Sequence, residues 1–354
     1  MTGPNYLAVR QDWLDRLVEP ASEPDLPIFE AHHHLWDRPG WRYLFDELLA
    51  DISTSGHRIV ATAFMQCQAM YRADGPPALR PVGETEFANG IAAMAASGRY
   101  GETRVCAAII GHADLRLGAG VKDVLYAHLK AGGGRFRGVR HITTWDADSS
   151  LTNPLSAGPA RMLADSRFRE GFACLAPLGL LFEAWLFHPQ LPELADLSHA
   201  FPQTTIVLNH CGGILGIGPY AGRRADILAE WSRDIRALAR HDNVNVKIGG
   251  LGMRINGFGF ERGDDPPSSE HLAAAWRPYV ETCIEAFGPD RCLFERNFPV
   301  DKGSYSYGAC WNAFKRLTRA ASPSDRNALF RGTAERLYGV DSFTHASDRI
   351  RTTH

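Results

Sequence analysis

Three consecutive histidines, His32, His33 and His34, lie near the end of a β-rich run, PIFEAHHHLW at residues 27–36. Because alternate side chains of a strand point to the same face, His32 and His34 share one face while His33 points away. Two imidazoles on one face can bind a metal ion or polarise a substrate oxygen. A hydrogen-bonded structural pair is the alternative. The spacing therefore predicts metal-binding or electrophilic chemistry at this position.

Other histidines occupy comparable positions along the chain. They lie at or near the ends of further β-rich runs: His112, His141, His188 and His210. One histidine at a strand end is weak evidence, because buried histidines with satisfied hydrogen bonds are common. Several at the same rim of a sheet predict a common site.

The elements that would position these histidines alternate between strand and helix. Eight runs favour strands: 27–36, 58–67, 103–112, 136–143, 179–188, 204–210, 243–249 and 291–298. The segments between them carry apolar residues at helical spacing. No GxGxxG phosphate loop follows the first run. Eight such units are typical of an α/β fold of the TIM-barrel type, a single (β/α)₈ barrel whose active site lies on the loops after the strands.

The barrel leaves additional segments outside its repeating units. We expect residues 1–26 to form an N-terminal extension, residues 27–340 the barrel domain and residues 341–354 a C-terminal tail. A stretch rich in Gly, Pro and charge, residues 252–270, follows the seventh strand. In a barrel such a loop faces the active site, so it is expected to form a loop or lid there.

Composition and charge argue against several kinds of partner. The chain has 38 basic and 40 acidic residues, a net charge of −2, and its basic residues do not cluster, so we expect no nucleic-acid partner. No run approaches the ~20 apolar residues of a membrane span, and the N-terminal residues are charged where a signal peptide is apolar. We therefore expect a cytoplasmic protein. Seven cysteines without a CxxC pair predict buried free thiols.

Several motifs resemble those of one family. The runs FEAHHHLWD, VLNHCGG and FERNFPVDKGS, in this order along the predicted strands, resemble the amidohydrolase-related family of TIM-barrel hydrolases. The branch of sugar-lactone and 2-pyrone-4,6-dicarboxylate lactonases is the most similar part of that family. The resemblance extends from about residue 27 to residue 340, and it implies the same barrel with hydrolytic chemistry at the strand ends.

The resemblance also implies which residues surround the reacting centre. Carried over position by position, they are His32, His34, His188, His210 and Asn297. The four histidines would be the ligands of a bound metal. Asn297 departs from the family, in which an aspartate at this place binds metal and acts as the general base. Since a neutral amide is a weak ligand and no base, one divalent cation such as Zn²⁺ and catalysis without a metal both stay open.

Without a carboxylate at position 297, another residue must act as the base. Asp301, four residues further along, is the candidate, and Lys302 beside it could bind a carboxylate or stabilise an oxyanion. Tyr305 is a further donor on the same loop. The alternative for Asp301 and Lys302 is an ion pair at the rim that contributes little.

Two further residues are predicted to bind substrate. Arg140 lies near the end of the fourth run, and its guanidinium matches a carboxylate in bidentate geometry. A salt bridge at the barrel rim is the alternative for Arg140. Gln66, at the end of the second run, can form a hydrogen bond with substrate.

Three functions are compatible with these residues. The leading hypothesis is a hydrolase that opens a lactone or related ester of a small carboxylic acid by attack of water on a polarised carbonyl. The first alternative is a non-oxidative decarboxylase of a small unsaturated or aromatic acid, because related family members use the same histidine pair in that way. The second is a non-catalytic barrel that binds a small acid. A homo-oligomer is compatible with the sequence, which carries no signature of oligomeric state.

Overall fold

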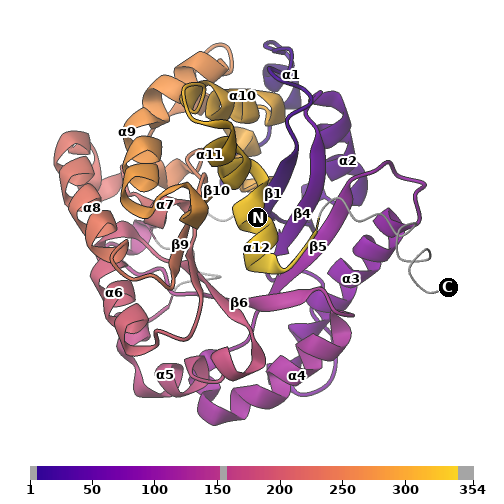
Figure 1. Cartoon of the computed structure of the whole chain (residues 1–354), viewed down its shortest axis with the longest axis vertical. Coiled ribbons are helices and arrows are strands. Elements are labelled where there is room, and N and C mark those ends of the chain that lie inside the picture. Colours follow the sequence, from indigo (N-terminus) through magenta and orange to yellow (C-terminus); the bar gives the residue numbers. More distant parts are fainter. Residues whose placement is uncertain (1–5, 152–157, 342–354) are drawn as a thin grey trace.

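The computed structural model describes residues 6–151 and 158–341, and its centre is an eight-stranded parallel sheet that curls into a nearly closed barrel (Figure 1). In spatial order the strands are β1 (Ile28–His33), β4 (Ile59–Met65), β5 (Arg104–Gly111), β6 (Phe136–Ile142), β7 (Leu181–Trp185), β8 (Ile206–Leu208), β9 (Val244–Ile248) and β10 (Cys292–Phe294). Each predicted run contains one of these strands, so the predicted TIM-barrel fold is confirmed.

Most of the helices surround the barrel on its outside, whereas α12 (Thr333–Tyr338) covers one end of it (Figure 1). The helices are α1 (Gln11–Leu14), α2 (Phe45–Thr54), α3 (Val82–Ala96), α4 (Val121–Ala131), α5 (Ser166–Phe172), α6 (Leu191–Ala200), α7 (His210–Gly213), α8 (Arg224–Leu238), α9 (Ser269–Phe287), α10 (Tyr307–Leu317), α11 (Pro323–Asn327) and α12. A short antiparallel hairpin, β2 (Trp36–Arg38) and β3 (Trp41–Tyr43), follows β1. The sequence analysis did not predict this hairpin.

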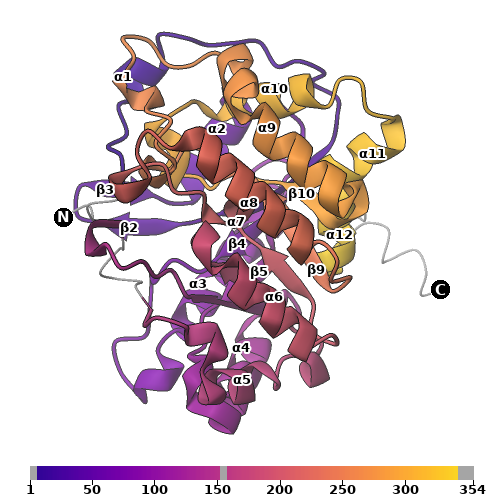
Figure 2. The ribbon, with the colours of Figure 1, turned by 90° about the vertical axis from the view of Figure 1, so that its left-hand side faces the viewer.

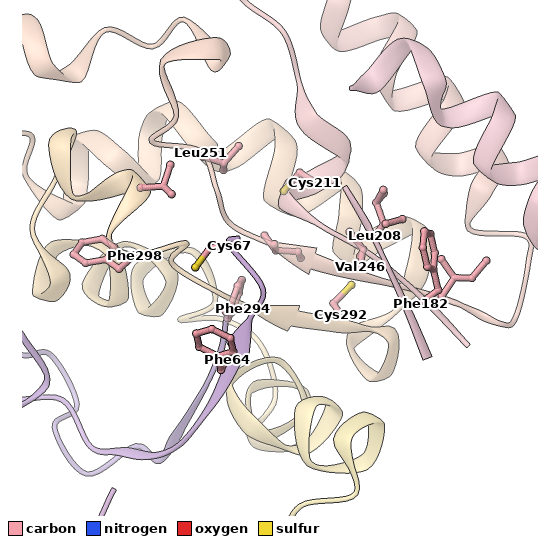
Figure 3. Close-up of a cluster of buried hydrophobic side chains, with 14 of the residues drawn as sticks. Phe64, Cys67, Phe182, Leu208, Cys211, Val246, Leu251, Cys292, Phe294 and Phe298 are labelled. Atoms are coloured by element: carbon pink, nitrogen blue, oxygen red, sulfur yellow. The ribbon is translucent and has the colours of Figure 1, made fainter. Parts of the chain in front are cut away.

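The spacing of apolar residues explains why the helices pack as they do. In α8 the buried side chains are Ile227, Trp231, Ile235 and Leu238, which recur at three- and four-residue intervals and form one face of the helix. Alternate strand residues point outward to meet such faces. Phe182, Leu208, Val246 and Phe294 belong to this buried layer between strands and helices (Figure 3).

The inside of the barrel is filled rather than hollow. Small apolar residues from β1, β4 and β5 pack there with Tyr338 of α12, which lies at the opposite end of the barrel from the β2–β3 hairpin (Figure 2). Lys247 and Glu183 form a fully buried ion pair at 2.8 Å, and the Tyr338 hydroxyl donates to Glu183 at 2.7 Å. One end is thus plugged, which leaves the carboxyl ends of the strands available for a site.

The described part of the N-terminal segment packs on the loop that follows β9. The Trp13 indole N–H donates to the carbonyl of Gly263 at 3.0 Å, and Arg10 donates to the carbonyl of Glu261 at 2.6 Å. The N-terminal segment therefore forms hydrogen bonds with the middle of the loop predicted at residues 252–270. All seven cysteines are buried and free, as predicted. Among the described residues, no helix has the length and apolar character needed to cross a membrane.

Candidate active site

A pocket opens at the carboxyl ends of the strands. The β2–β3 hairpin lies at this end of the barrel (Figure 2). The empty space of the pocket is about 800 Å³, a volume that includes open solvent at the mouth. Four of the residues predicted from the sequence line it: His34, Arg140, His210 and Asn297. Loops after different strands therefore bring distant parts of the chain to one place.

The histidine pair lies as the strand alternation predicts. The Nε2 atoms of His32 and His34 are 3.3 Å apart, whereas His33 points away and contacts the Thr62 hydroxyl at 2.8 Å. Nδ1 of His34 lies 2.9 Å from the carbonyl oxygen of Met65. Because a carbonyl only accepts hydrogen bonds, this nitrogen must carry the proton. Nε2 of His34 therefore presents a lone pair toward His32.

The closing seam of the barrel brings Asn297 to this pair. A β-bridge joins His33 to Phe298, and the His34 amide donates to the Phe298 carbonyl at 2.9 Å. Asn297 has a φ of +56°, a left-handed conformation that asparagine tolerates better than most residues. Its Oδ1 lies 3.3 Å from His34 Nε2, and its Nδ2 donates to Asp301 Oδ1 at 2.9 Å. Asn297 thus connects Asp301 to the histidine pair.

His210 reaches the pocket from the turn directly after β8. Its φ is +54°, and a Cβ at the neighbouring Gly250 would clash with its ring, so close approach requires glycine there. Nδ1 of His210 lies 2.7 Å from Oε1 of the fully buried Glu295. When Glu295 is ionised, Nδ1 donates to it and Nε2 carries the lone pair. Glu295 therefore sets both the tautomer and the orientation of His210.

These contacts make the centre rich in hydrogen-bond acceptors. Arg140 Nη1 lies 3.2 Å from His32 Nε2, so that nitrogen also accepts. The lone pairs of His32, His34 and Asn297 consequently converge, and the His210 ring lies with its centroid 4.5 Å from that of His32. Arg140 satisfies the lone pair of His32 Nε2, so the facing acceptors on His34 and Asn297 are the ones that need a cation, a water or a substrate donor.

The donor set fits one divalent metal ion. Ligand atoms of His32, His210 and Glu295 lie within 4.8 Å of one another. The 3.3 Å between the Nε2 atoms of His32 and His34 is close to the edge of a tetrahedron built from Zn–N bonds of about 2.0 Å. Arg140 offers His32 Nε2 a different positive partner at 3.2 Å. These residues can therefore bind a metal ion, or they can work without one, with the Arg140 guanidinium as the positive group.

Burial controls the charge of these groups. It lowers the pKa of His32, His34 and His210 well below the ordinary value for histidine, so all three are neutral at neutral pH. Burial also raises the pKa of Glu295 to about 8, against the opposing charge of Lys247. The imidazoles can thus bind a cation or accept a proton.

Two arginines lie beside the acceptors. Arg140 is buried and donates to the carbonyl of Gln66, and it has no carboxylate in an ion pair among residues 6–151 and 158–341. Gln66 does not line the pocket and returns a hydrogen bond to the Arg140 carbonyl at 3.3 Å, so it supports Arg140. Arg38 lines the pocket, donates to the Cys67 carbonyl at 2.7 Å and lies 4.1 Å from the Trp36 ring centroid. Both guanidinium groups are suited to binding an anionic group.

Another side of the pocket is apolar. We call it the apolar wall, and its side chains come from the loops after β6, β7 and β9: Leu151, Trp185, Phe187, Met253 and Ile255. These residues belong to one continuous cluster. The loop after β9 thus contributes to the pocket, as the sequence analysis expected, although only through its first residues.

Two residues predicted for the site lie elsewhere. His188 follows β7, its Nδ1 accepts from the Leu215 amide at 3.2 Å, and its ring packs on Tyr220. Lys302 pairs with Asp51 at 2.7 Å in a separate groove. Neither lines the pocket. The structure therefore does not bring His188 to the predicted metal ligands, nor Lys302 to the predicted substrate site.

Asp301 and Tyr305 lie one layer behind the pocket. Both are buried, and neither lines it. One oxygen of Asp301 accepts from Asn297, while the other accepts from the Gly252 amide at 2.9 Å and the Tyr305 hydroxyl at 2.5 Å. Burial raises the pKa of Asp301 to about 8. Asp301 therefore reaches the histidines only through Asn297, an arrangement that does not fit our expectation of a base in contact with water.

The sequence analysis missed Glu295 and Arg38. Glu295 precedes Asn297 by two residues, the same alternation that singled out the pair His32 and His34, so strand spacing could have identified it. Arg38 stands on the unpredicted hairpin, whose two strands are only three residues long. No periodic signal identifies strands that short.

The chain belongs to the amidohydrolase family, whose model matches residues 29–340. The y4mH protein of Sinorhizobium fredii is 32% identical over 339 residues, which cover 89% of this chain and 99% of the relative. An L-fucono-1,5-lactonase from Burkholderia multivorans is 26% identical over 240 residues, 68% of this chain and 73% of the relative. Family membership identifies an enzyme of the amidohydrolase superfamily, as the motifs had suggested.

Solved structures confirm the fold. A crystal structure of an amidohydrolase from Burkholderia multivorans with bound zinc has a TM-score of 0.68 and 23% identity, covering 89% of this chain and 99% of that one. A Pseudomonas putida protein assigned as a 2-pyrone-4,6-dicarboxylic acid hydrolase has a TM-score of 0.58 and 16% identity, covering 89% and 98%.

Proposed function

We propose that this enzyme adds water to a lactone, or a related ester, of a small carboxylic acid. The observation that carries the proposal is the cluster of acceptors on His32, His34 and Asn297 beside the guanidinium of Arg140. Acceptors bind the hydrogens of a water molecule, so the water oxygen keeps a lone pair for attack. The lactonase relative and the structure assigned as a pyrone-acid hydrolase are named for hydrolysis of the same type of bond.

The arginines would divide two tasks. Arg140 contacts His32 directly, so its guanidinium is placed to stabilise the oxyanion that forms when water adds to the carbonyl. Arg38 is further from the centre, on the hairpin. It would bind the carboxylate of the substrate and fix the position of the ring.

His210 is the proposed general base. Its neutral ring can take a proton from water at Nε2 while ionised Glu295 holds Nδ1–H at 2.7 Å. When the tetrahedral intermediate collapses and the ester C–O bond of the ring breaks, His210 returns this proton to the leaving ring oxygen. Asp301 is a positioning residue in this scheme, because it orients the Asn297 amide so that Oδ1 faces His34.

A metal would occupy the same acceptors. His32, His34 and His210 would hold it, with Glu295 as the carboxylate of the set. A bound Zn²⁺ would lower the pKa of a water ligand and polarise the lactone carbonyl. The zinc-bound Burkholderia structure supports a metal, whereas the Arg140 contact with His32 supports activity without one.

The test combines product analysis with metal analysis. Purified enzyme is assayed against a panel of lactones and lactone acids, with and without chelator, and its metal content is measured. Ring opening without carbon dioxide supports the proposal. Carbon dioxide release from an unsaturated or aromatic acid, with no lactone opened, would show decarboxylation instead of hydrolysis. Stoichiometric zinc in the purified enzyme, together with loss of activity when the chelator removes it, would show that the metal is required.

A further inference from the structure

The division of the pocket into a charged side and an apolar side bears on the substrate itself. Arg38, Cys67 and Gln68 line the pocket from the loops after β1 and β4, and the rings of Tyr6 and Trp36, which the Arg38 guanidinium contacts, line it beside them. The apolar wall lines another side, from the loops after β6, β7 and β9. His34, Arg140, His210 and Asn297 line the pocket as well, and they are the reactive groups.

The apolar wall is a built surface rather than a few isolated side chains. Leu151, Phe187 and Ile255 are almost fully buried and pack with Leu215 behind them. Trp185 and Met253 pack against the same cluster. Within these pocket-lining side chains, the only hydrogen-bonding group is the Trp185 indole N–H. A ligand surface that lies on this wall therefore gains by being apolar.

We propose that the substrate is an amphipathic lactone acid, with an anionic group bound by Arg38 and an alkyl or aryl body on the apolar wall. This inference rests on the proposed function and narrows it. A sugar lactone carries hydroxyl groups around its ring, and each one buried without a partner costs roughly 5–150-fold in binding. The five side chains of the wall offer one partner for such a ring, the Trp185 N–H, although Tyr6 and Thr144 also line the pocket. We therefore infer that a body lying on the wall is apolar, unlike the polyhydroxylated lactone named for the Burkholderia relative.

A series of synthetic substrates tests this preference in the wild-type enzyme. The first set consists of six-membered lactones with a ring carboxylate and an alkyl substituent that grows by one methylene at a time. One matched set lacks the carboxylate. The other keeps the carboxylate and replaces the alkyl group by ring hydroxyls, and it provides the polyol probe. We expect kcat/KM to rise about fourfold per methylene until the wall is covered. The polyol should be at least ~100-fold poorer than the best alkyl acid.

Two variants locate the preference in the pocket. Ile255→Thr keeps the β-branch, removes one methyl group and places a hydroxyl on the wall. It should therefore lower kcat/KM of the long-chain lactone acids more than that of the unsubstituted one and flatten the dependence of kcat/KM on chain length. Arg38→Gln should weaken only the carboxylated substrates, through KM. Met94→Gln, an exposed position on α3, is the control and should match wild type. Thermal unfolding of each variant shows whether it is folded.

The outcomes separate this inference from the function on which it rests. A polyol lactone turned over as well as, or better than, the alkyl acids would overturn the inference and leave lactone hydrolysis standing. If no lactone is opened, the proposed function fails, and calorimetric binding of the ring-opened hydroxy acids then tests the pocket alone. Tighter binding of the alkyl hydroxy acid than of the ring-opened polyol with the same number of carboxylates would still support the inference, and equal or weaker binding would reject it.

Discussion

Replacing Glu295 by Gln tests the role of the buried carboxylate behind His210. Oε1 of Glu295 lies 2.7 Å from His210 Nδ1, and its side chain is fully buried. The amide of Gln can keep a hydrogen bond with Nδ1 but carries no charge. A hydrogen bond to a charged group contributes about 1.5–3 kcal/mol, which corresponds to roughly 10–150-fold in rate. We therefore expect kcat/KM of Glu295→Gln to fall by that factor.

The pH profile adds a second readout. Because burial raises the pKa of Glu295 to about 8, its ionised form increases as pH rises through that value. Wild-type kcat/KM should therefore rise toward pH 8, and Glu295→Gln should lose this dependence. The pKa of Asp301 is also raised to about 8, so Asp301→Asn is measured in parallel. If ionisation of Glu295 causes the rise of kcat/KM with pH, the Asp301→Asn variant keeps this rise, although its kcat/KM is lower at every pH.

Steady-state kinetics with the best lactone, a pH series and elemental analysis measure these effects. Glu285→Gln is the matched control, since Glu285 is a surface residue paired with Arg236, and it should behave as wild type. A Glu295→Gln enzyme with wild-type kcat/KM and an unchanged pH profile would refute the assignment of Glu295 to the site.

Three further predictions follow from the same contacts. His32→Ala and His34→Ala should each lower turnover by at least ~100-fold with the fold kept; wild-type activity would show that the pair is structural. Asn297→Asp should raise zinc affinity, measured by competition with a chelator, because the new carboxylate adds an anionic ligand. The new carboxylate at position 297 would lie beside Asp301, whose Oδ1 is 2.9 Å from Nδ2 of Asn297 in the wild type, so the two carboxylates would share a proton. Unchanged zinc affinity would argue against a metal at this position. Burial lowers the pKa of His128 to about 4, so its contribution to stability is complete above pH 6.5 and is lost as pH falls toward 4. Urea unfolding at pH 7 and pH 5 should show wild type losing about 2 kcal/mol more than His128→Gln, and equal losses would contradict burial of a neutral His128 imidazole.

The barrel was predictable because its signals are local and repeated. Strand alternation placed His32 and His34 on one face and His33 on the other. The strand ends were less accurate. The predicted run 204–210 contains a strand of only Ile206–Leu208, because the chain leaves the sheet to form the turn that carries His210. Residues of a site at a barrel rim lie on loops and turns, and the sequences of loops and turns have no periodic pattern from which their conformation can be predicted.

Long-range placement was harder to predict than residue type. Asp301 was expected at the barrel mouth, but the short helical turn after Pro299 buries it, and the Gly252 amide holds it behind Asn297. His188 was assigned by its position after a strand, whereas its ring turns toward Tyr220 and the Leu215 amide. Such choices depend on partners far away in the sequence.

The most direct test of lactone hydrolysis is mass spectrometry of the product. Wild-type enzyme and His34→Ala are incubated with an alkyl-substituted lactone acid in water labelled with heavy oxygen. We predict that the product gains one water, with the label in the new carboxylate, and that His34→Ala forms it at least ~100-fold more slowly. Loss of carbon dioxide, or the same rate in both proteins, would contradict hydrolysis at this site.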